Sequence, residues 1–321
     1  MTRIVVGVDG GGSRTRVTVA DERGTPIASV EAGPSAVRPG ETERAAGVIA
    51  AAVGQALQAA GMAAVTPAVL CVGVAGAGRE PERHALWQAL AGRDLADDVM
   101  VHADATIALD DAFADGPGIL LIAGTGSVAF GRGPTGTMAR CGGWGPICGD
   151  EGGGAWIGRR ALSVVTAAAD GREPETALSG AVLTAAQVGT VDALIAWSAA
   201  ATPADLASLA PAVLQCAEGG DLRASALVTF AAEELVVHLR TLARKLFVDE
   251  RAAAPIAFAG GLLGRRSPLR ARVEHRLKSA VPGAQVDPRE IDPARGAVRG
   301  ALRVLAGAAS SSSPSSSSPS S

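Results

Sequence analysis

The chain has 321 residues, of which 48% are hydrophobic and only 3% aromatic, so it predicts about two domains with cores of Ala, Val and Leu. The net charge of −3 excludes a bulk polybasic nucleic-acid binder and gives no electrostatic reason for membrane attachment. Because neither a leader peptide nor an apolar run of about 20 residues is evident, we expect a cytoplasmic protein that does not span a membrane.

The first part of the chain predicts a β-meander, with strands at Arg3–Val8, Arg14–Ala20 and Pro26–Ala32 joined by turns rich in Gly and Asp. Along the second strand polarity alternates with period 2, which is typical of a strand with one buried face. Helices and strands then alternate: helix Glu41–Ala60, strand Ala68–Val74, helix Pro81–Leu90, strand Val99–His102 and helix Asp104–Phe113.

A second module begins with two strands separated by a Gly turn, and a Gly-dense loop and a long helical region follow. The pattern changes to helix at about residue 155, and breaks are expected near Pro203, Pro211 and Gly219. The predicted elements are strands Gly118–Ala123 and Val128–Arg132, loop Gly142–Gly154, helices over 155–169 and within 173–250, strand Pro255–Phe258, and helices Pro268–Ala280 and Ala294–Ala306. Residues 310–321 contain only Ser and Pro, which predicts a disordered tail or a cloning remnant.

The two modules open in the same way. Ile4–Ser13 and Ile119–Ser127 each read as a strand, a Gly turn and the start of a second strand. This weak internal repeat predicts two similar lobes that face a cleft.

The two Gly turns, Asp9–Ser13 and Gly124–Ser127, are candidate phosphate sites, because clustered backbone N–H groups without Cβ atoms bind anions. Neither is a Walker A loop or a dinucleotide fingerprint, since both of those lead into a helix and a strand follows here. Each turn taken alone is equally compatible with an ordinary hairpin; the pair favours a polyphosphate. Asp9 is suited to hold Mg²⁺, directly or through water, or to cap its own turn.

Two carboxylates are candidates for work on a sugar. Asp104 follows a strand and opens a helix, so it is either the base that accepts a hydroxyl proton or the N-cap of that helix. Asp150 lies in the Gly-dense loop with Trp144, a composition suited to accepting hydrogen bonds from a polyol and to walling its ring. Glu151 assists it or caps the next helix. Gly260–Gly261 suits backbone contact with a ring or ribose, or close helix–strand packing.

The chain carries, in this order, the motifs Val8–Thr15, Ala103–Asp104, Ile122–Ser127, Cys141–Gly145, Gly149–Gly152 and Ala259–Gly261. Their combination resembles the N-acetylglucosamine kinase and BadF/BadG/BcrA/BcrD-type ATPase family, within the actin-like, sugar-kinase and heat-shock ATPase superfamily. The resemblance covers residues 3–306. It implies an α/β fold of two ribonuclease-H-like lobes around a central cleft: residues 1–113 with 294–307, and residues 114–293 with a helical insertion, followed by a tail over 308–321.

The resemblance also implies an ATP-dependent amino-sugar kinase that phosphorylates a sugar 6-hydroxyl, with ATP and Mg²⁺ as cofactors, in a homodimer. In it Asp104 is the catalytic base. The sugar contacts implied are Gly143, Trp144, Gly145 and Asp150, and the ATP contacts implied are Ser13, Thr125 and Gly261. From the glycine turns themselves we predict Asp9 as the Mg²⁺ residue and, as further ATP contacts, Gly11, Gly12, Thr15, Gly126 and Gly260.

One departure from the family concerns the sugar. Relatives that resemble the animal enzyme have a sugar-contacting Asn after the third strand, whereas Gly33–Arg38 contains none. Ser35 or Arg38 is a candidate replacement, and Arg38 would suit an acidic sugar. N-acetylglucosamine, glucosamine and N-acetylmuramic acid therefore all remain candidate substrates.

Two alternatives share the fold. An ATPase that activates a dehydratase or reductase would need two cysteines per chain for a bridging iron–sulfur cluster, and Cys141 and Cys148 are the only local pair. A sugar sensor without turnover would bind the same sugar. Absence of brown colour and of iron in the purified protein would exclude the activating ATPase, and sugar-dependent consumption of ATP separates a kinase from a sensor.

Overall fold

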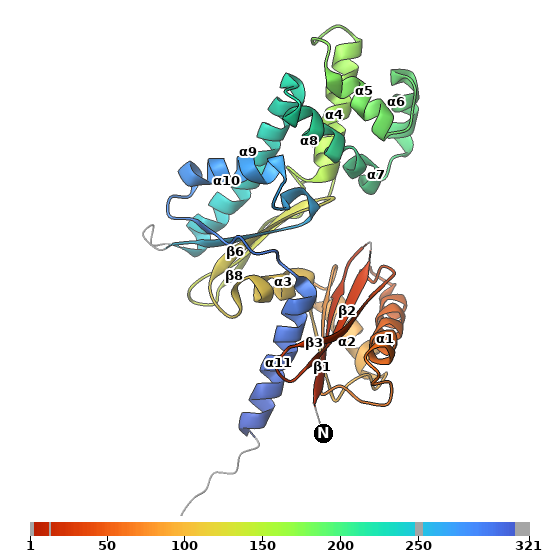
Figure 1. Ribbon diagram of the computed structural model, residues 1–321, viewed down its shortest axis with the longest axis vertical. Helices are drawn as coiled ribbons and strands as arrows, with labels where there is room; N and C mark the ends of the chain where they lie inside the picture. Colours follow the sequence, from red (N-terminus) through yellow and green to blue (C-terminus); the bar gives the residue numbers. More distant parts are fainter. Residues whose placement is uncertain (1–2, 13, 248–252, 312–321) are drawn as a thin grey trace, which may run out of the picture. The chain divides into compact units, whose positions relative to one another are not determined.

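The computed structural model describes residues 3–12, 14–247 and 253–311. It divides into two compact units, which we describe separately (Figure 1). Unit 1 comprises Met1–Asp115 and Asp292–Ser321, and unit 2 comprises Gly116–Ile291. The last helix therefore belongs to the same unit as the N-terminal strands.

Unit 1 is built on a sheet of order β3-β2-β1-β4-β5. The first three strands form the expected antiparallel meander, and β4 and β5 run parallel to β1. β1 and β4 are nearly continuous apolar runs because both of their faces are covered. The strands are β1 (Ile4–Gly10), β2 (Thr15–Asp21), β3 (Pro26–Ala32), β4 (Val69–Val74) and β5 (Asp98–Ala103).

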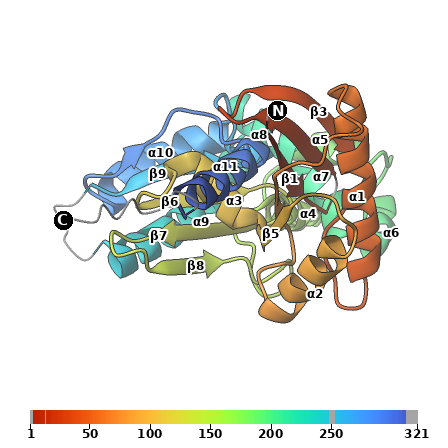
Figure 2. The same ribbon diagram turned by 90° about the horizontal axis from the view of Figure 1, so that it is seen from below.

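Helices cover both faces of this sheet, α1 and α2 on one and α3 and α11 on the other (Figures 1 and 2). Alternate residues of β1 serve the two cores, with Val6 and Val8 in the first and Val5 in the second. At Gly7 a Cβ would lie 2.6 Å from the backbone N of Val298, so glycine lets α11 lie directly on β1. The helices are α1 (Thr42–Ala59), α2 (Glu80–Ala91), α3 (Asp104–Phe113) and α11 (Pro293–Ser311).

Asp111 on α3 ties this helix to α11. Its side chain is fully buried and receives Arg295 in a bidentate pair, with Nε to Oδ1 at 2.6 Å and Nη2 to Oδ2 at 2.7 Å. The backbone N–H of Asp292 donates to Oδ2 at 2.8 Å, and Arg299 Nη1 donates to the Asp111 carbonyl at 2.7 Å. The hydrogen bond to Asp111 helps raise the pKa of Arg295. The network fixes α3, the helix that Asp104 opens.

We expect Asp111→Ala to lower the free energy of unfolding by about 3 kcal/mol, because it removes the buried member of a hydrogen-bonded ion pair. Urea denaturation of the purified protein measures the change. Asp115→Ala is the matched control, since Asp115 pairs with Arg303 at the surface with 77% of its side chain exposed, and it should cost far less. Equal losses in the two variants would contradict the network's role.

Unit 2 repeats the design, with a sheet of order β10-β9-β6-β7-β8. Its β6, β7 and β8 form an antiparallel meander, β9 runs parallel to β6, and β10 runs parallel to β9. Order and directions match unit 1 strand for strand, so the predicted α/β fold of two ribonuclease-H-like lobes is confirmed. The strands are β6 (Gly118–Ala123), β7 (Ser127–Arg132), β8 (Met138–Gly142), β9 (Pro255–Ala259) and β10 (Gln285–Val286).

The long helix α9 contacts the sheet and carries a nearly continuous apolar stripe. Helices α4, α8 and α10 pack against α9, whereas α5, α6 and α7 contact α4. The predicted breaks near Pro203, Pro211 and Gly219 are confirmed, because one helix ends and the next begins close to each. Pro203 and Pro211 lie in the first turns of α7 and α8, where the N–H that proline lacks would have no partner within the helix. The helices are α4 (Gly154–Ala169), α5 (Ala177–Ala185), α6 (Val191–Ala200), α7 (Pro203–Ser208), α8 (Ala210–Glu218), α9 (Leu222–Leu246), the 3₁₀ turn η1 (Gly261–Leu263) and α10 (Pro268–Ala280).

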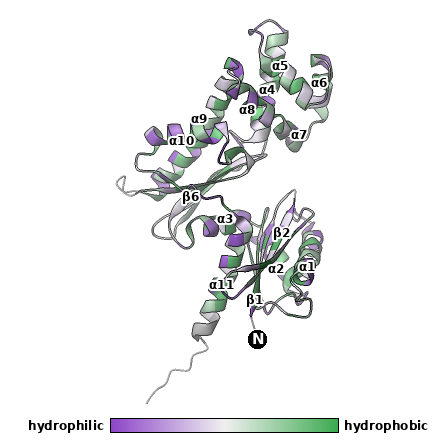
Figure 3. Cartoon of the chain, viewed as in Figure 1, coloured by the Kyte–Doolittle hydropathy of each residue, from purple (hydrophilic) through white to green (hydrophobic). Residues whose placement is uncertain are grey.

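Both α10 and α11 alternate between hydrophilic and hydrophobic residues along their length (Figure 3). α11 continues to Ser311, past its predicted end at Ala306, and the rest of the predicted tail, 312–321, lies outside the described residues. Within the part of the chain that the structure describes, no helix combines the length and the apolar character needed to cross a membrane.

Candidate active site

In unit 1 two carboxylates lie at the carboxyl ends of parallel strands. Asp9 is the penultimate residue of β1, in register with Gly73 on β4, which is in turn in register with His102 on β5. Asp104 follows β5 directly and is the first residue of α3. This edge of an open α/β sheet is where ligands commonly bind.

Asp104 is not the N-cap of α3, since that position is Ala103. Its Oδ1 accepts a hydrogen bond from the backbone N–H of Ala105 at 2.8 Å. Burial raises the pKa of Asp104, against the opposing effect of the backbone N–H groups of Ala105 and of Asp104 itself. A partly buried carboxylate with a raised pKa is a better proton acceptor than an ordinary surface aspartate.

The pKa of Asp9 is raised to about 6, mainly by burial and then by the negative charge of Asp104, while Arg16 opposes the shift. Arg16 lies opposite Asp9 on β2, but its Nη1 and Nη2 are also engaged by Asp292 at 3.4 Å and Glu31 at 3.2 Å. Two neighbouring carboxylates whose charges are incompletely compensated fit a divalent cation, which favours the ionised form of both.

We expect Asp9→Asn to raise the free energy of unfolding at pH 7.5 by up to about 3 kcal/mol. The folded-state pKa of about 6 lies above the unfolded value of 3.8, so the folded protein holds this proton more tightly. The stability it confers is present below the unfolded value and is lost as the pH rises through about 6. Urea denaturation across this pH range, without ligands, measures the effect.

Asp21→Asn is a control of opposite sign, because backbone N–H groups of Thr25 and Arg23 lower the pKa of Asp21. Its removal should cost stability at neutral pH and cost less in acid. A stability difference between Asp9→Asn and wild type that stayed constant with pH would contradict the shifted pKa.

Hydrogen bonds hold the predicted phosphate turn of unit 1 in place. Gly11 N donates to Arg14 O at 2.8 Å, and its carbonyl accepts the N–H groups of Ser35 and Ala36, both at 3.1 Å. Thr15 is fully buried, with its Oγ1 2.7 Å from both Gly33 O and Ser35 Oγ.

Thr15 and Ser35 therefore support the turn from within, and Ser35 does not face solvent. Gly12 is exposed, and no described atom lies within 4 Å of a Cβ placed there. Ser13 lies outside the described residues.

The second predicted phosphate turn joins β6 to β7 and is bonded to the Gly-dense loop. Gly124 N donates to Gly126 O at 2.9 Å, which closes the turn. The first N–H groups of α4 cap it from behind: Gly154 N donates to Gly124 O at 2.8 Å and Ala155 N to Thr125 O at 2.9 Å. Thr125 itself is exposed. The turn and the loop that precedes α4 are thus one connected piece of structure.

The Gly-dense loop adopts a backbone that only this composition allows. Gly142, Gly143, Gly145 and Gly152 all have positive φ, and so does Asp150, at 58°. Asp150 Oδ1 accepts the N–H of Gly145 at 3.2 Å, and burial raises the pKa of the carboxyl. A non-glycine residue held in this region is strained and is typical of ligand-binding sites.

Trp144, on the same loop, is 70% exposed, with the guanidinium of Arg140 4.5 Å from its ring centroid. It is therefore not part of a core. A large exposed aromatic face held by a cation is available to a ligand.

His238 on α9 was not predicted as a site residue. It is buried beneath the loop, where Gly142 leaves room for its ring: a Cβ there would lie 2.9 Å from Cε1 and 3.0 Å from Nε2. Its Nε2 is 3.7 Å from Glu151 Oε2, and its Nδ1 has no hydrogen-bond partner among the described residues. Burial lowers the pKa of His238, so it is a neutral support of the loop at physiological pH. A lone histidine in an apolar helical stripe gives no sequence signal.

Gly260 directly follows β9 and has a φ of 89°. A Cβ there would lie 2.2 Å from the carbonyl oxygen of Ala123, the residue immediately before the second phosphate turn. Gly261 is exposed and begins η1. The close-packing interpretation of this glycine pair thus holds for Gly260, and the backbone of Gly261 is accessible.

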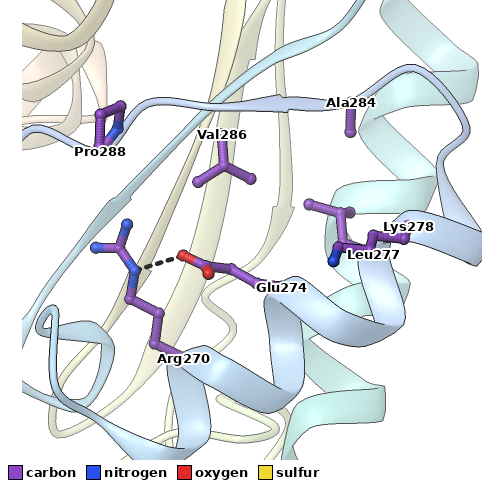
Figure 4. A pocket seen from close by; sticks show the side chains of 7 residues that line it. All are labelled: Arg270, Glu274, Leu277, Lys278, Ala284, Val286 and Pro288. Atoms are coloured by element: carbon purple, nitrogen blue, oxygen red, sulfur yellow. Dashed lines mark hydrogen bonds and ion pairs between the residues drawn. The ribbon is translucent and has the colours of Figure 1, made fainter.

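A pocket of about 350 Å³ lies between α10 and β10 (Figure 4). Arg270 and Glu274 form an ion pair in it, Nε to Oε1 at 2.7 Å, and Leu277 and Val286 also line it. None of the predicted site residues that the structure describes lines this pocket. Among the described residues there is also no cluster of three or more His, Cys, Asp or Glu side chains that could hold a metal.

Several known proteins that are similar to this chain are sugar kinases. The N-acetylmuramic acid/N-acetylglucosamine kinase of Clostridium acetobutylicum is 28% identical over 298 residues, 92% of this chain and 97% of that protein. The glucosamine kinase of Vibrio cholerae is 30% identical over 242 residues, 75% of this chain and 80% of that protein. A crystal structure of a putative N-acetylglucosamine kinase from Chromobacterium violaceum superimposes with a TM-score of 0.77 at 31% identity, covering 92% of this chain and 98% of that one.

The similarity spans both units rather than one motif. The model of the BadF/BadG/BcrA/BcrD ATPase family matches residues 6–302, which run from β1 into α11. The chain belongs to the BadF/BadG/BcrA/BcrD ATPase family.

Proposed function

We propose that the protein is an ATP-dependent amino-sugar kinase that phosphorylates the 6-hydroxyl of N-acetylglucosamine or a close relative. The observation that carries the proposal is the pair of partly buried carboxylates, Asp9 and Asp104, at the carboxyl ends of β1 and β5. Transfer of a phosphoryl group to a hydroxyl needs a proton acceptor and a cation site side by side, and this pair supplies both.

In the proposed reaction Asp104 accepts the proton of the sugar 6-hydroxyl while that oxygen attacks the γ-phosphorus of ATP. The new bond joins the sugar oxygen to phosphorus, the bond from phosphorus to the β,γ-bridging oxygen breaks, and ADP leaves with its electron pair. Protonated Asp104 then releases its proton to water. The hydrogen bond from Ala105 N holds the carboxylate in one orientation throughout.

The ATP contacts are proposed from the two glycine turns and from the pair Gly260 and Gly261. Gly11, Gly12, Ser13, Thr125 and Gly126 would bind the phosphates through backbone N–H groups and hydroxyls. Gly260 and Gly261 would lie by the adenosine, and Thr15 acts indirectly because it is buried. Mg²⁺, held by Asp9 together with water and phosphate oxygens, would neutralise charge on the transferring group.

The sugar contacts are proposed from the Gly-dense loop. The Asp150 carboxylate would accept hydrogen bonds from ring hydroxyls, and the exposed face of Trp144 would pack against the ring. Backbone groups of Gly143 and Gly145 complete the set. The homodimer implied by the family resemblance stays a prediction.

Arg38 supplies a test of which sugar is used, because it is exposed and lies in the segment where relatives have the sugar-contacting Asn. Ser35, the other candidate replacement, is buried. We expect Arg38→Ala to raise the KM for N-acetylmuramic acid about tenfold and to change that for N-acetylglucosamine less than about twofold, since only the former carries a carboxylate. Steady-state kinetics with both sugars measure it. Arg44→Ala, which removes an exposed arginine bonded to Pro34 O and Ala36 O, is the control. Equal effects on both sugars would contradict a carboxylate contact.

The proposal is tested by measuring ADP release with a panel of glucosamine, N-acetylglucosamine, N-acetylmannosamine and N-acetylmuramic acid. A kinase consumes ATP in proportion to added sugar. A sugar sensor would bind one of these sugars without ADP release, and a dehydratase-activating ATPase would hydrolyse ATP without regard to them.

A further inference from the structure

We propose that Gly126, in the second phosphate turn, is the positioning residue of the sugar-binding carboxylate: the Cβ it lacks leaves the space in which the Asp150 side chain lies. The inference rests on the proposed function, because it concerns how that function's Asp150 is held. Gly126 would then serve two ligands: its backbone would contact the phosphates, and the space beside it would orient the carboxylate that binds the sugar.

The contact is direct. A Cβ placed on Gly126 would lie 2.3 Å from Oδ2, 2.7 Å from Cγ and 3.2 Å from Oδ1 of Asp150. The φ of Gly126 is not positive, so its backbone conformation is open to any residue. Space, and not conformation, requires glycine at this position.

The turn cannot retreat to make room. Its carbonyl oxygens at Gly124 and Thr125 accept the first N–H groups of α4, at 2.8 and 2.9 Å. On its other side the turn packs closely against the backbone of Gly153, where a Cβ would lie 2.6 Å from the carbonyl carbon of Gly126. A methyl group at residue 126 must therefore displace the end of the Asp150 side chain, which is the softest of its neighbours.

Displacement would cost Asp150 its orientation. The residue is already held at a φ of 58°, and its Oδ1 accepts the N–H of Gly145 at 3.2 Å. The two oxygens belong to one planar carboxylate, so a rotation about either side-chain bond, χ1 or χ2, that takes Oδ2 away from Gly126 also moves Oδ1 relative to the N–H of Gly145. The polar groups that should face the sugar are then misplaced while the turn itself stays intact.

The experiment is a double-mutant cycle on sugar kinetics. We expect Gly126→Ala to raise the sugar KM about tenfold or more, the size of a lost charge-assisted hydrogen bond. In an Asp150→Ala background, where the obstructing atoms are gone, Gly126→Ala should change the sugar KM less than about twofold. Gly180→Ala is the control, because Gly180 lies on α5, outside the proposed site, and no described atom lies within 4 Å of a Cβ placed there; it should leave the sugar KM within about twofold.

Additive effects in the cycle, or a Gly126→Ala variant that raises only the KM for ATP, would overturn the proposal. If Gly126→Ala fails to fold, Asp150→Ala should restore folding in the double variant, and failure to do so would also overturn it. A crystal structure of Gly126→Ala gives a readout independent of activity: we expect the Asp150 carboxylate to have left the N–H of Gly145, and an unmoved carboxylate contradicts the proposal. A wild-type protein without sugar-dependent ATP turnover would instead refute the proposed function.

Discussion

Replacing Asp104 by Asn should lower kcat by a factor of about 10³ and leave the sugar KM nearly unchanged. Asn retains an oxygen that can accept the N–H of Ala105, so the start of α3 is preserved, but the amide cannot take a proton from the 6-hydroxyl. Asp104→Ala should lower kcat by at least as much. Because the group acts in the transition state, kcat and kcat/KM should fall together.

Asp98→Asn is the matched control for this variant, since Asp98 is an exposed aspartate at the opposite end of the same strand, β5. It should keep wild-type kcat. If Asp104→Asn retained more than about a tenth of wild-type kcat, Asp104 would not be the base.

Replacing Asp150 by Ala should raise the sugar KM about a hundredfold, with a much smaller effect on the KM for ATP. The carboxylate is the acceptor that the loop holds in a strained backbone conformation, and a charged acceptor lost from a site costs more than a neutral one. Titration calorimetry with sugar alone measures the same loss without turnover.

Asp170→Ala serves as its control, because Asp170 is the exposed C-cap of α4 and its side chain pairs with Arg172. It should bind sugar as the wild type does. An Asp150→Ala variant with an unchanged sugar Kd and KM would exclude Asp150 from the sugar site.

Much of the fold could be predicted because local pattern and tertiary packing agree. α3 and α10 begin and end at the predicted residues, and α10 has the expected signals, with Ser267 accepting the N–H of Leu269 as N-cap and Pro268 in the first turn. β8 was not predicted because it lies at a sheet edge and exposes Met138, so it has no apolar run. β10 is two residues long and carries no pattern of its own.

The candidate site could be predicted only where a residue's type and its local motif indicate its chemistry. Asp9, Asp104 and Asp150 were predicted as site residues from their positions before a Gly turn, after a strand and in the Gly-dense loop, and their roles stay predictions. The burial of Thr15 and the exposure of Trp144 depend on neighbours distant in sequence, such as Ser35. The close contact of Gly126 with Asp150 depends on the folding of the whole loop and has no local signal.

The measurement that tests the central claim most directly is the identity of the phosphorylated product. We predict that incubation of the wild-type protein with ATP, Mg²⁺ and an amino sugar yields one sugar monophosphate whose phosphorus couples to the two C6 protons in ³¹P–¹H NMR, and that Asp104→Asn yields almost none. Phosphate on the anomeric oxygen, or inorganic phosphate released without any sugar phosphate, would contradict the account.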